Sequence, residues 1–81
     1  MEKHRLIIES IRVPAKRRKT LDDDKVTVLA EDILENGQKV AISVRPDAKG
    51  FVLIEGLHRL EALRALGELE VDAYLVRARI H

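Results

Sequence analysis

The hydrophobic pattern of the chain changes abruptly at one glycine, and this change restricts the fold more than any other feature. Residues 51–56, FVLIEG, begin with a continuous apolar run, which is typical of a strand buried on both faces. A helical pattern then begins near His58, in LHRLEALRALG, and Gly67 is a natural place for it to end. The sequence therefore predicts a strand that leads into a helix at Gly56, as in mixed folds of helices and strands.

The longest predicted helix lies within TLDDDKVTVLAEDILENGQ, residues 20–38. Thr20 is the expected N-cap, and Asp23 occupies the capping-box position three residues later, beside other aspartates that suit the positive end of the helix dipole. Asn36 and Gly37 form the expected C-terminal stop. One face of this helix is expected to be buried, and it consists of Val26, Leu29, Ala30, Ile33 and Leu34.

Strands are predicted on both sides of the two helices. Residues 4–13 are rich in β-branched side chains and are followed by Pro14, which predicts one strand or two short ones. Residues 40–44, VAISV, alternate between larger and smaller side chains, so the valines and the isoleucine are expected on one buried face. RPDAKG, residues 45–50, is typical of a turn, which predicts a hairpin with the strand that follows. Residues 71–76 predict a last strand.

These elements succeed one another in the order β-α-β-β-α-β. The order predicts the α/β (α+β) class, with a small mixed sheet and two main helices in one domain that covers residues 1–81. A chain of 81 residues has a core that gives only about 3–5 kcal/mol of net stability, so a second domain is not expected.

Composition argues against several classes of function. The chain contains no cysteine, so it has neither a disulfide nor a thiol nucleophile. Its three histidines lack the close spacing of a helical pair of metal ligands, and no metal site is expected. No apolar run is long enough for a membrane span or a signal peptide, which predicts a cytoplasmic protein without a membrane partner. The net charge of +1 is too small to indicate nucleic-acid binding by overall electrostatics.

The corner at Gly56 has the residues of an anion site. Glycine leaves space for a ligand or for a neighbouring backbone, and the next amides lack intrahelical acceptors. A cationic Arg59 is unfavourable at the positive end of a helix, by roughly a few tenths of a kcal/mol, unless an anion lies between them. A phosphate would reverse this, because charge-assisted hydrogen bonds are each worth about 1.5–3 kcal/mol. In the alternative interpretation, Gly56 only permits a tight turn, Arg59 is solvated and His58 is partly buried against the sheet.

Short motifs follow one another in a fixed order between residues 11 and 77: a proline segment rich in arginine (VPAKRR), L-D-x-x-K-V, I-x-x-N-G, I-x-V, G-x-H-R-x-x-A, and L-G before the last strand. In this combination they resemble the ParB/sulfiredoxin superfamily, also known as ParB-like nuclease domains. The resemblance implies that the G-x-H-R-x-x-A box binds the phosphates of a nucleoside triphosphate, which is CTP in ParB partition proteins and ATP in sulfiredoxins. A cofactor of this kind, ATP or CTP with Mg²⁺, is therefore expected.

Carried over residue by residue, the resemblance implies a set of nucleotide-binding and phosphate-binding residues: Gly56, Leu57, His58, Arg59, Lys25 and Arg18. Leu57 occupies the position of the reactive cysteine of sulfiredoxins, so repair of sulfinic acids by that chemistry is not expected. Partition proteins carry a helix-turn-helix DNA-binding domain and a dimerising tail after this unit. Sequence-specific centromere binding is therefore not expected of this chain alone.

Three functional hypotheses follow. The first is a nucleotide-binding regulatory or plasmid-partition-related module that acts with a protein partner. The second is a small nucleotide-dependent enzyme, a hydrolase, kinase or nuclease, in which Glu55 at the end of its strand is the candidate to hold Mg²⁺ or to orient water. The third is an adaptor that binds DNA or another nucleic acid through a basic run, Lys16, Arg17, Arg18 and Lys19. Charge runs are usually solvated, and in the alternative interpretation the nearby aspartates neutralise this one. Base identity, turnover and oligomeric state are left open.

Overall fold

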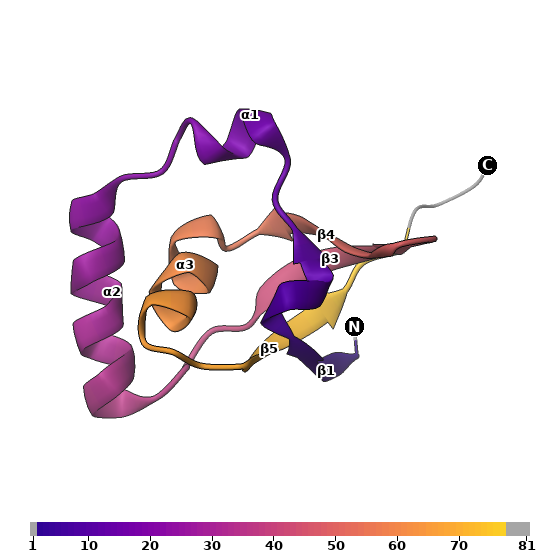
Figure 1. Cartoon of the computed structure of the whole chain (residues 1–81). Helices are drawn as coiled ribbons and strands as arrows, with labels where there is room; N and C mark the ends of the chain where they lie inside the picture. The colour runs from indigo at the N-terminus through magenta and orange to yellow at the C-terminus, as the bar shows by residue number, and fades with distance from the viewer. Residues whose placement is uncertain (1, 78–81) are drawn as a thin grey trace.

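A computed structural model describes residues 2–77 of the chain (Figure 1). Each predicted element is present, together with a short α-helix and a 3₁₀ helix that the sequence did not indicate. In chain order the elements are β1 (Lys3–Ile7), the 3₁₀ helix η1 (Ile8–Ser10), β2 (Ile11–Arg12), α1 (Ala15–Arg18), α2 (Asp23–Asn36), β3 (Ile42–Asp47), β4 (Gly50–Glu55), α3 (Leu57–Ala65) and β5 (Glu70–Leu75). None of the helices in this described part is long and apolar enough to cross a membrane.

The strands form one mixed sheet in the order β1-β5-β3-β4-β2. β3 and β4 form the predicted antiparallel hairpin, and β1 pairs with β5 in the antiparallel sense. Two pairs are parallel, β3 with β5 and β2 with β4. The two main helices lie on one side of this sheet, with α3 between the sheet and α2 (Figure 1). This architecture confirms the predicted class, a small mixed sheet with two main helices.

The strand predicted at residues 4–13 is in fact two short strands at opposite edges of the sheet. β1 and β2 are separated only by η1, whose Ile8 is buried in the core. The outer strands of a flat five-stranded sheet would lie about 19 Å apart, whereas the chain from Ile7 to Ile11 spans at most about 14 Å. The sheet must therefore be strongly twisted and curled, which brings its two edges toward each other.

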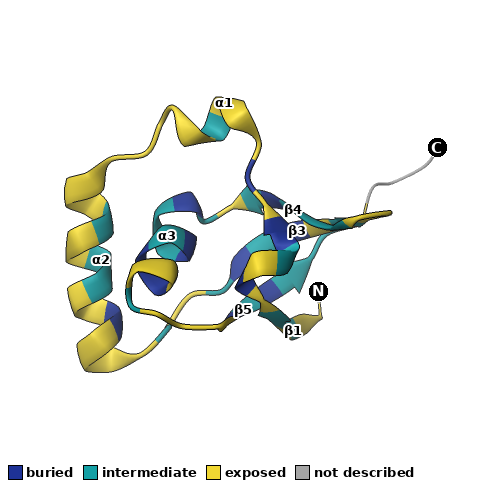
Figure 2. Ribbon diagram, in the orientation of Figure 1, coloured by how far each residue is buried: buried dark blue, intermediate teal, exposed yellow. Residues whose placement is uncertain are grey.

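The core lies between the sheet and α3 (Figure 2). Its largest fully buried side chains are Ile42, Leu53, Leu60, Val44 and Val71. From α2 only Ile33 is buried, whereas Leu34, which helical spacing placed on the buried face, is 77% exposed. α2 packs against another helix, so its contact stripe is narrow and one of two adjacent residues faces outward. Val40 is also exposed, contrary to prediction, because β3 begins only at Ile42.

β3 is longer than predicted at its other end. It extends to Asp47, so the turn expected at residues 45–50 is reduced to residues 48 and 49. Val44 directs its carbonyl toward β5, where it accepts a hydrogen bond from the N–H of Val76 (2.7 Å). Pro46, two residues further on, directs its backbone to the same side, but β5 no longer pairs there. The missing N–H of proline therefore removes no ladder bond.

α2 begins later than predicted because a different residue caps it. Its N-cap is Asp22, whose carboxylate accepts hydrogen bonds from the backbone N–H groups of Asp24 (3.0 Å) and Lys25 (3.4 Å). The prediction that Thr20 is the N-cap is wrong. The Thr20 hydroxyl donates instead to the carbonyl of Arg17 (2.7 Å), at the end of α1, the helical turn that lies within the basic run.

Candidate functional site

The corner between β4 and α3 requires glycine on two counts. Gly56 has φ 105° and ψ 31°, in the left-handed region. A Cβ added at this position would lie 2.6 Å from Cγ2 of Ile42. The space that the absent Cβ leaves is therefore filled by the Ile42 side chain of β3, so packing, rather than the approach of a ligand, accounts for glycine at this corner.

The start of α3 leaves backbone donors without partners inside the helix. Its first helical hydrogen bond runs from the N–H of Leu60 to the carbonyl of Gly56 (2.9 Å), so the amides of residues 57–59 have no intrahelical acceptor. Gly56 is the N-cap of α3 and has no side chain that could accept a hydrogen bond from these amides, and the first turn contains no acidic residue. The half-buried Arg59 makes no ion pair with any residue that the structure describes. The positive end of the helix thus lies beside a cation that forms no ion pair within residues 2–77.

Two grooves flank this helix start and divide the predicted binding residues between them. The first, of about 840 Å³, is lined by Arg18 from α1 and Leu57 from α3, among others. The second, of about 460 Å³, is lined by Lys25 from α2 and His58 from α3. The two remaining predicted residues, Gly56 in the corner and Arg59 in the first turn, line neither groove. The structure therefore brings the six residues around one helix start, but on two sides of it.

His58 makes a contact that sequence reasoning did not anticipate. Its ring nitrogen Nε2 accepts a hydrogen bond from the backbone N–H of Asp22 at 3.0 Å. Asp22 caps α2, and His58 lies in the first turn of α3, so this bond joins the starts of the two main helices. Lys25 lies close by, because its own backbone N–H donates to the Asp22 carboxylate. The positive ends of two helices therefore converge at the predicted site.

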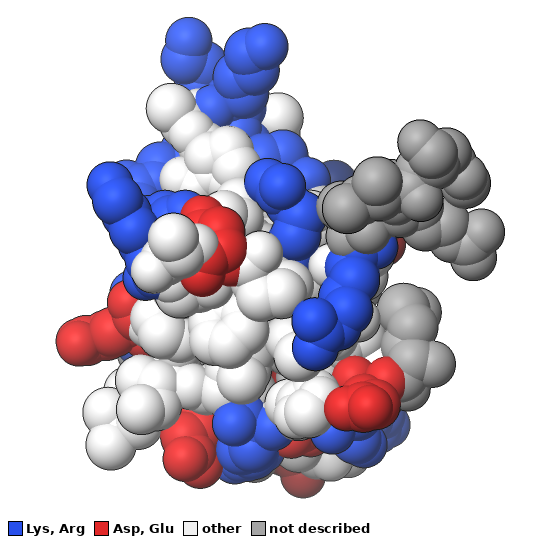
Figure 3. Space-filling view, turned by 90° about the vertical axis from the view of Figure 1, so that its right-hand side faces the viewer, with Lys and Arg blue, Asp and Glu red and all other residues white. Residues whose placement is uncertain are grey.

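The residues of the basic run, Lys16 to Lys19, which overlaps α1, have two different roles. The guanidinium of Arg17 is half-buried and donates to the carbonyl of Ile54, close to the end of β4. Arg17 thus fastens α1 to the strand that leads into the corner. Lys16, Arg18 and Lys19 are exposed and take part in no ion pair within residues 2–77. Figure 3 shows Lys and Arg side chains gathered at the top of the molecule, where Figure 1 places α1.

Glu55, the candidate to hold Mg²⁺, is the last residue of β4 and is exposed. It directly precedes the corner and therefore lies next to the start of α3. Within the described residues, no three His, Asp or Glu side chains are grouped so that they could hold a metal ion. A Mg²⁺ ion at this site would accordingly take most of its ligands from phosphate oxygens and water.

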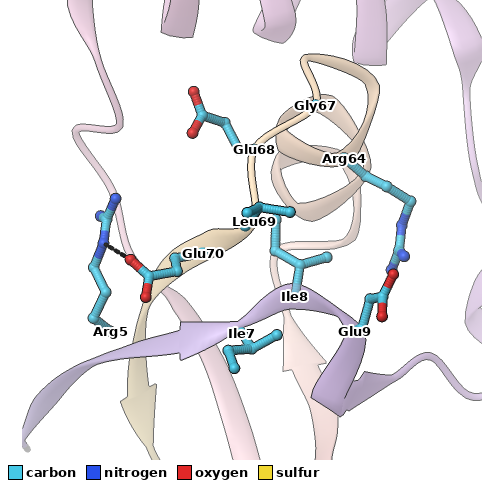
Figure 4. Close-up of a pocket in the computed structure, with 9 residues that line it drawn as sticks. All are labelled: Arg5, Ile7, Ile8, Glu9, Arg64, Gly67, Glu68, Leu69 and Glu70. Atoms are coloured by element: carbon cyan, nitrogen blue, oxygen red, sulfur yellow. Dashed lines mark hydrogen bonds and ion pairs between the residues drawn. The ribbon is translucent and has the colours of Figure 1, made fainter.

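A third groove, of about 740 Å³, lies at the other end of α3 (Figure 4). Its apolar lining residues include Ile7, Ile8 and Leu69, and an ion pair between Arg5 and Glu70 (3.3 Å) lies at one side. None of the predicted site residues lines this groove, so it is separate from the candidate site.

Comparisons with known proteins agree with this fold. The family model of the ParB N-terminal domain matches residues 2–80. No curated protein matches the chain. Among solved structures, sulfiredoxin from Arabidopsis thaliana is similar, with a TM-score of 0.85 and 28% identity over 96% of this chain and 88% of that one.

Two larger proteins contain the same fold. One is the C-terminally truncated chromosome-partitioning protein ParB from Caulobacter crescentus complexed with CTP-γ-S, with a TM-score of 0.83 and 22% identity over 98% of this chain and 46% of that one. The other is a free serine kinase in complex with AMP, with a TM-score of 0.79 and 13% identity over 94% of this chain and 31% of that one. The present chain thus spans less than half the length of either.

Proposed function

The chain belongs to the ParB N-terminal domain family, and from this premise we propose that it binds a nucleoside triphosphate whose phosphates lie at the start of α3. The observation that carries the proposal is the unpartnered positive charge at this helix start. The amides of residues 57–59 have no intrahelical acceptors, and Arg59 has no ion-pair partner among the described residues. An oxyanion placed there would satisfy the amides and the guanidinium together.

The groove on the α2 side suits the nucleoside part of such a ligand. Its surface is almost entirely apolar, with Val28 and Leu29 on one wall, and Asp24, Lys25 and His58 also line it. Its volume of about 460 Å³ lies within the usual range for small-molecule sites, about 300–1,000 Å³. The groove on the α1 side carries the exposed Arg18, which is available to the terminal phosphates.

Related structures support a nucleotide as the ligand. The ParB of Caulobacter crescentus was solved with CTP-γ-S, and the serine kinase with AMP. For this chain we propose ATP or CTP with Mg²⁺, the ion being held mainly by the phosphates, beside Glu55. The chain has no cysteine and Leu57 supplies no nucleophile, so we propose no thiol chemistry at this corner. We propose that the chain is a regulatory or partition-related module that acts with a protein partner.

A second candidate function, DNA-backbone binding, is favoured by one specific observation. Lys16, Arg18 and Lys19 are exposed on α1 and around its end, and none of them takes part in an ion pair within the described residues. Three unpaired cations at one end of the molecule suit a phosphate backbone. Such binding would weaken steeply with salt, because each phosphate contact releases counterions.

Amide chemical shifts distinguish these functions. The ¹⁵N-labelled protein is titrated with ATP, CTP, GTP, ADP and a short DNA duplex, with and without Mg²⁺. A triphosphate is expected to shift the amides of residues 56–60 first. DNA would instead shift residues 16–19, in a salt-dependent manner. If every nucleotide leaves residues 56–60 unmoved at millimolar concentration, the proposed function is wrong.

Matched variants test the role of the guanidinium. Arg59→Ala is expected to weaken triphosphate binding about tenfold or more, because a charge-assisted hydrogen bond contributes about 1.5–3 kcal/mol. Arg45→Ala is the control, since Arg45 is exposed on β3 and lines neither of the two grooves. An equal effect of both substitutions would indicate only general electrostatics. Incubation with the bound triphosphate then decides between a binding module, which leaves it intact, and an enzyme, which accumulates product.

A further inference from the structure

The hydrogen bond between His58 and Asp22 requires an acceptor nitrogen on the imidazole ring. The Asp22 amide is the donor at 3.0 Å, so Nε2 of His58 must offer a lone pair. The ring is then neutral, and its proton is on Nδ1. Asp22 is the N-cap of α2, and its own N–H lies outside the helical ladder, so the ring nitrogen satisfies a donor that the helix cannot.

This bond also joins the two walls of the groove on the α2 side, where we place the nucleoside. His58 forms one wall of the groove from α3, and Lys25, Val28 and Leu29 belong to the opposite wall on α2. Within residues 2–77 it is the one hydrogen bond between α3 and residues 20–36. The two helices otherwise meet through apolar side chains, which are less directional than a hydrogen bond. Among the described residues, the neutral ring therefore supplies the one directional contact between the two walls at this end of the groove.

Protonation of His58 would remove the bond. A proton on Nε2 would point at the Asp22 N–H, and two donors cannot share a hydrogen bond. The ring would turn away from Asp22, and the positive ends of two helices would add to its displacement. Asp24 and Lys25 on α2 line the same groove as the ring, and Asp22 contacts the ring directly. The other charged groups near the start of α3 in the sequence are Glu55, Arg59 and Glu61, of which Glu61 lines the groove on the α1 side.

We propose that His58 is a positioning residue, a neutral hydrogen-bond acceptor that holds the starts of α2 and α3 together, and not a cationic ligand of phosphate. The consequence for nucleotide affinity rests on the proposed function. If His58 were a cationic ligand, acidification would charge it and tighten nucleotide binding. As a positioning residue it has the opposite effect, because acidification opens the groove. The direction of the pH dependence therefore separates the two roles.

The test compares affinities for ATP and for CTP at pH 7.5 and pH 5.5 in the wild type, His58→Gln and His58→Lys. Gln offers an acceptor oxygen to Asp22 and does not titrate, so its profile records every effect of pH other than the protonation of residue 58. The wild type is expected to lose at least about threefold more affinity than His58→Gln over this range. His58→Lys, which has no acceptor, is expected to bind weakly at both pH values. Parallel profiles of the wild type and His58→Gln, or a wild type that gains affinity relative to His58→Gln, would overturn the proposal.

A second measurement needs no nucleotide. The ¹⁵N shifts of the His58 ring in the free protein identify its tautomer, and the Asp22 amide shift is followed as the pH is lowered. We expect the Nδ1–H tautomer and an Asp22 amide that moves together with the ring. An Nε2–H tautomer, or an Asp22 amide that ignores ring protonation, would overturn the role of His58 whether or not nucleotide binds. Failure of the wild type to bind any nucleotide, with these ring signals as expected, would count against the proposed function alone.

Discussion

Gly56 and Gly67 lie at the two ends of α3 with positive φ angles of 105° and 78°, but only Gly56 is packed against a neighbour. An added Cβ at Gly67 meets nothing within 4 Å, so Gly67→Ala is expected to cost only the left-handed backbone strain, about 1–2 kcal/mol. Gly56→Ala adds a collision with Ile42, and overpacking of this kind costs roughly a further 1–3 kcal/mol. Urea unfolding of both variants measures the difference. Equal losses of stability would show that Ile42 simply moves aside.

At this scale the sequence predicts the chemistry of single residues better than their partners. The glycine corner and the cation beside it can be read from residues 56–59, because they are neighbours in the chain. The partners of Gly56 and His58 are Ile42 and Asp22, which are distant in sequence and meet only after α2 and β3 have packed. Arg17 is similar, since a basic run gives no sign that one member reaches the end of β4. Local pattern therefore located the candidate site but did not predict the contacts that build it.

The start of α2 shows how one helix can have two possible caps. Asp22 accepts from two backbone amides of α2, whereas Thr20 donates to α1. Asp22→Ala is therefore expected to destabilise the protein by about 0.5–2 kcal/mol, the usual effect of removing an N-cap. Thr20→Ala is the matched control and is expected to cost less, because α2 keeps its cap. Urea unfolding and helical circular dichroism measure both effects, and a larger loss for Thr20→Ala would contradict the assignment.

Element ends were predicted well where the chain itself supplies the stop, and less well where packing decides. Gly37 ends α2 as predicted, and its N–H donates to the carbonyl of Ile33 (2.7 Å). The first helical turn, α1, was not predicted, because four residues carry no hydrophobic period. Pro46 suggested a turn, yet β3 continues through it, because the absence of a β5 partner there is a property of the sheet and not of residues 45–50.

On the scale of the whole molecule, an arginine at each edge of the sheet forms ion pairs with a neighbouring part of the sheet. Arg5 on β1 pairs with Asp72 (2.9 Å) and Glu70 (3.3 Å) on β5. Arg12 on β2 pairs with Asp47, at the end of β3. Both arrangements are exposed, so each contributes little to global stability. Their effect is local, because β2 is only two residues long and has few ladder bonds to hold it at its edge.

The pH dependence of the β2 edge follows from Asp47. The hydrogen bond from Arg12, and then that from the backbone N–H of Lys49, hold the pKa of Asp47 below its ordinary value. A carboxyl whose pKa is lower in the folded state stabilises that state fully above its unfolded pKa, near about 4. This contribution is lost as the pH falls through the lower folded value.

We therefore expect hydrogen exchange at Ile11 and Arg12 to be slower in the wild type than in Asp47→Asn at pH 6, after correction for intrinsic rates. The difference should shrink below about pH 4, as the wild-type side chain takes up its proton and loses its charge. A difference that grows on acidification would mean that the ion pair does not hold β2 at the edge of the sheet.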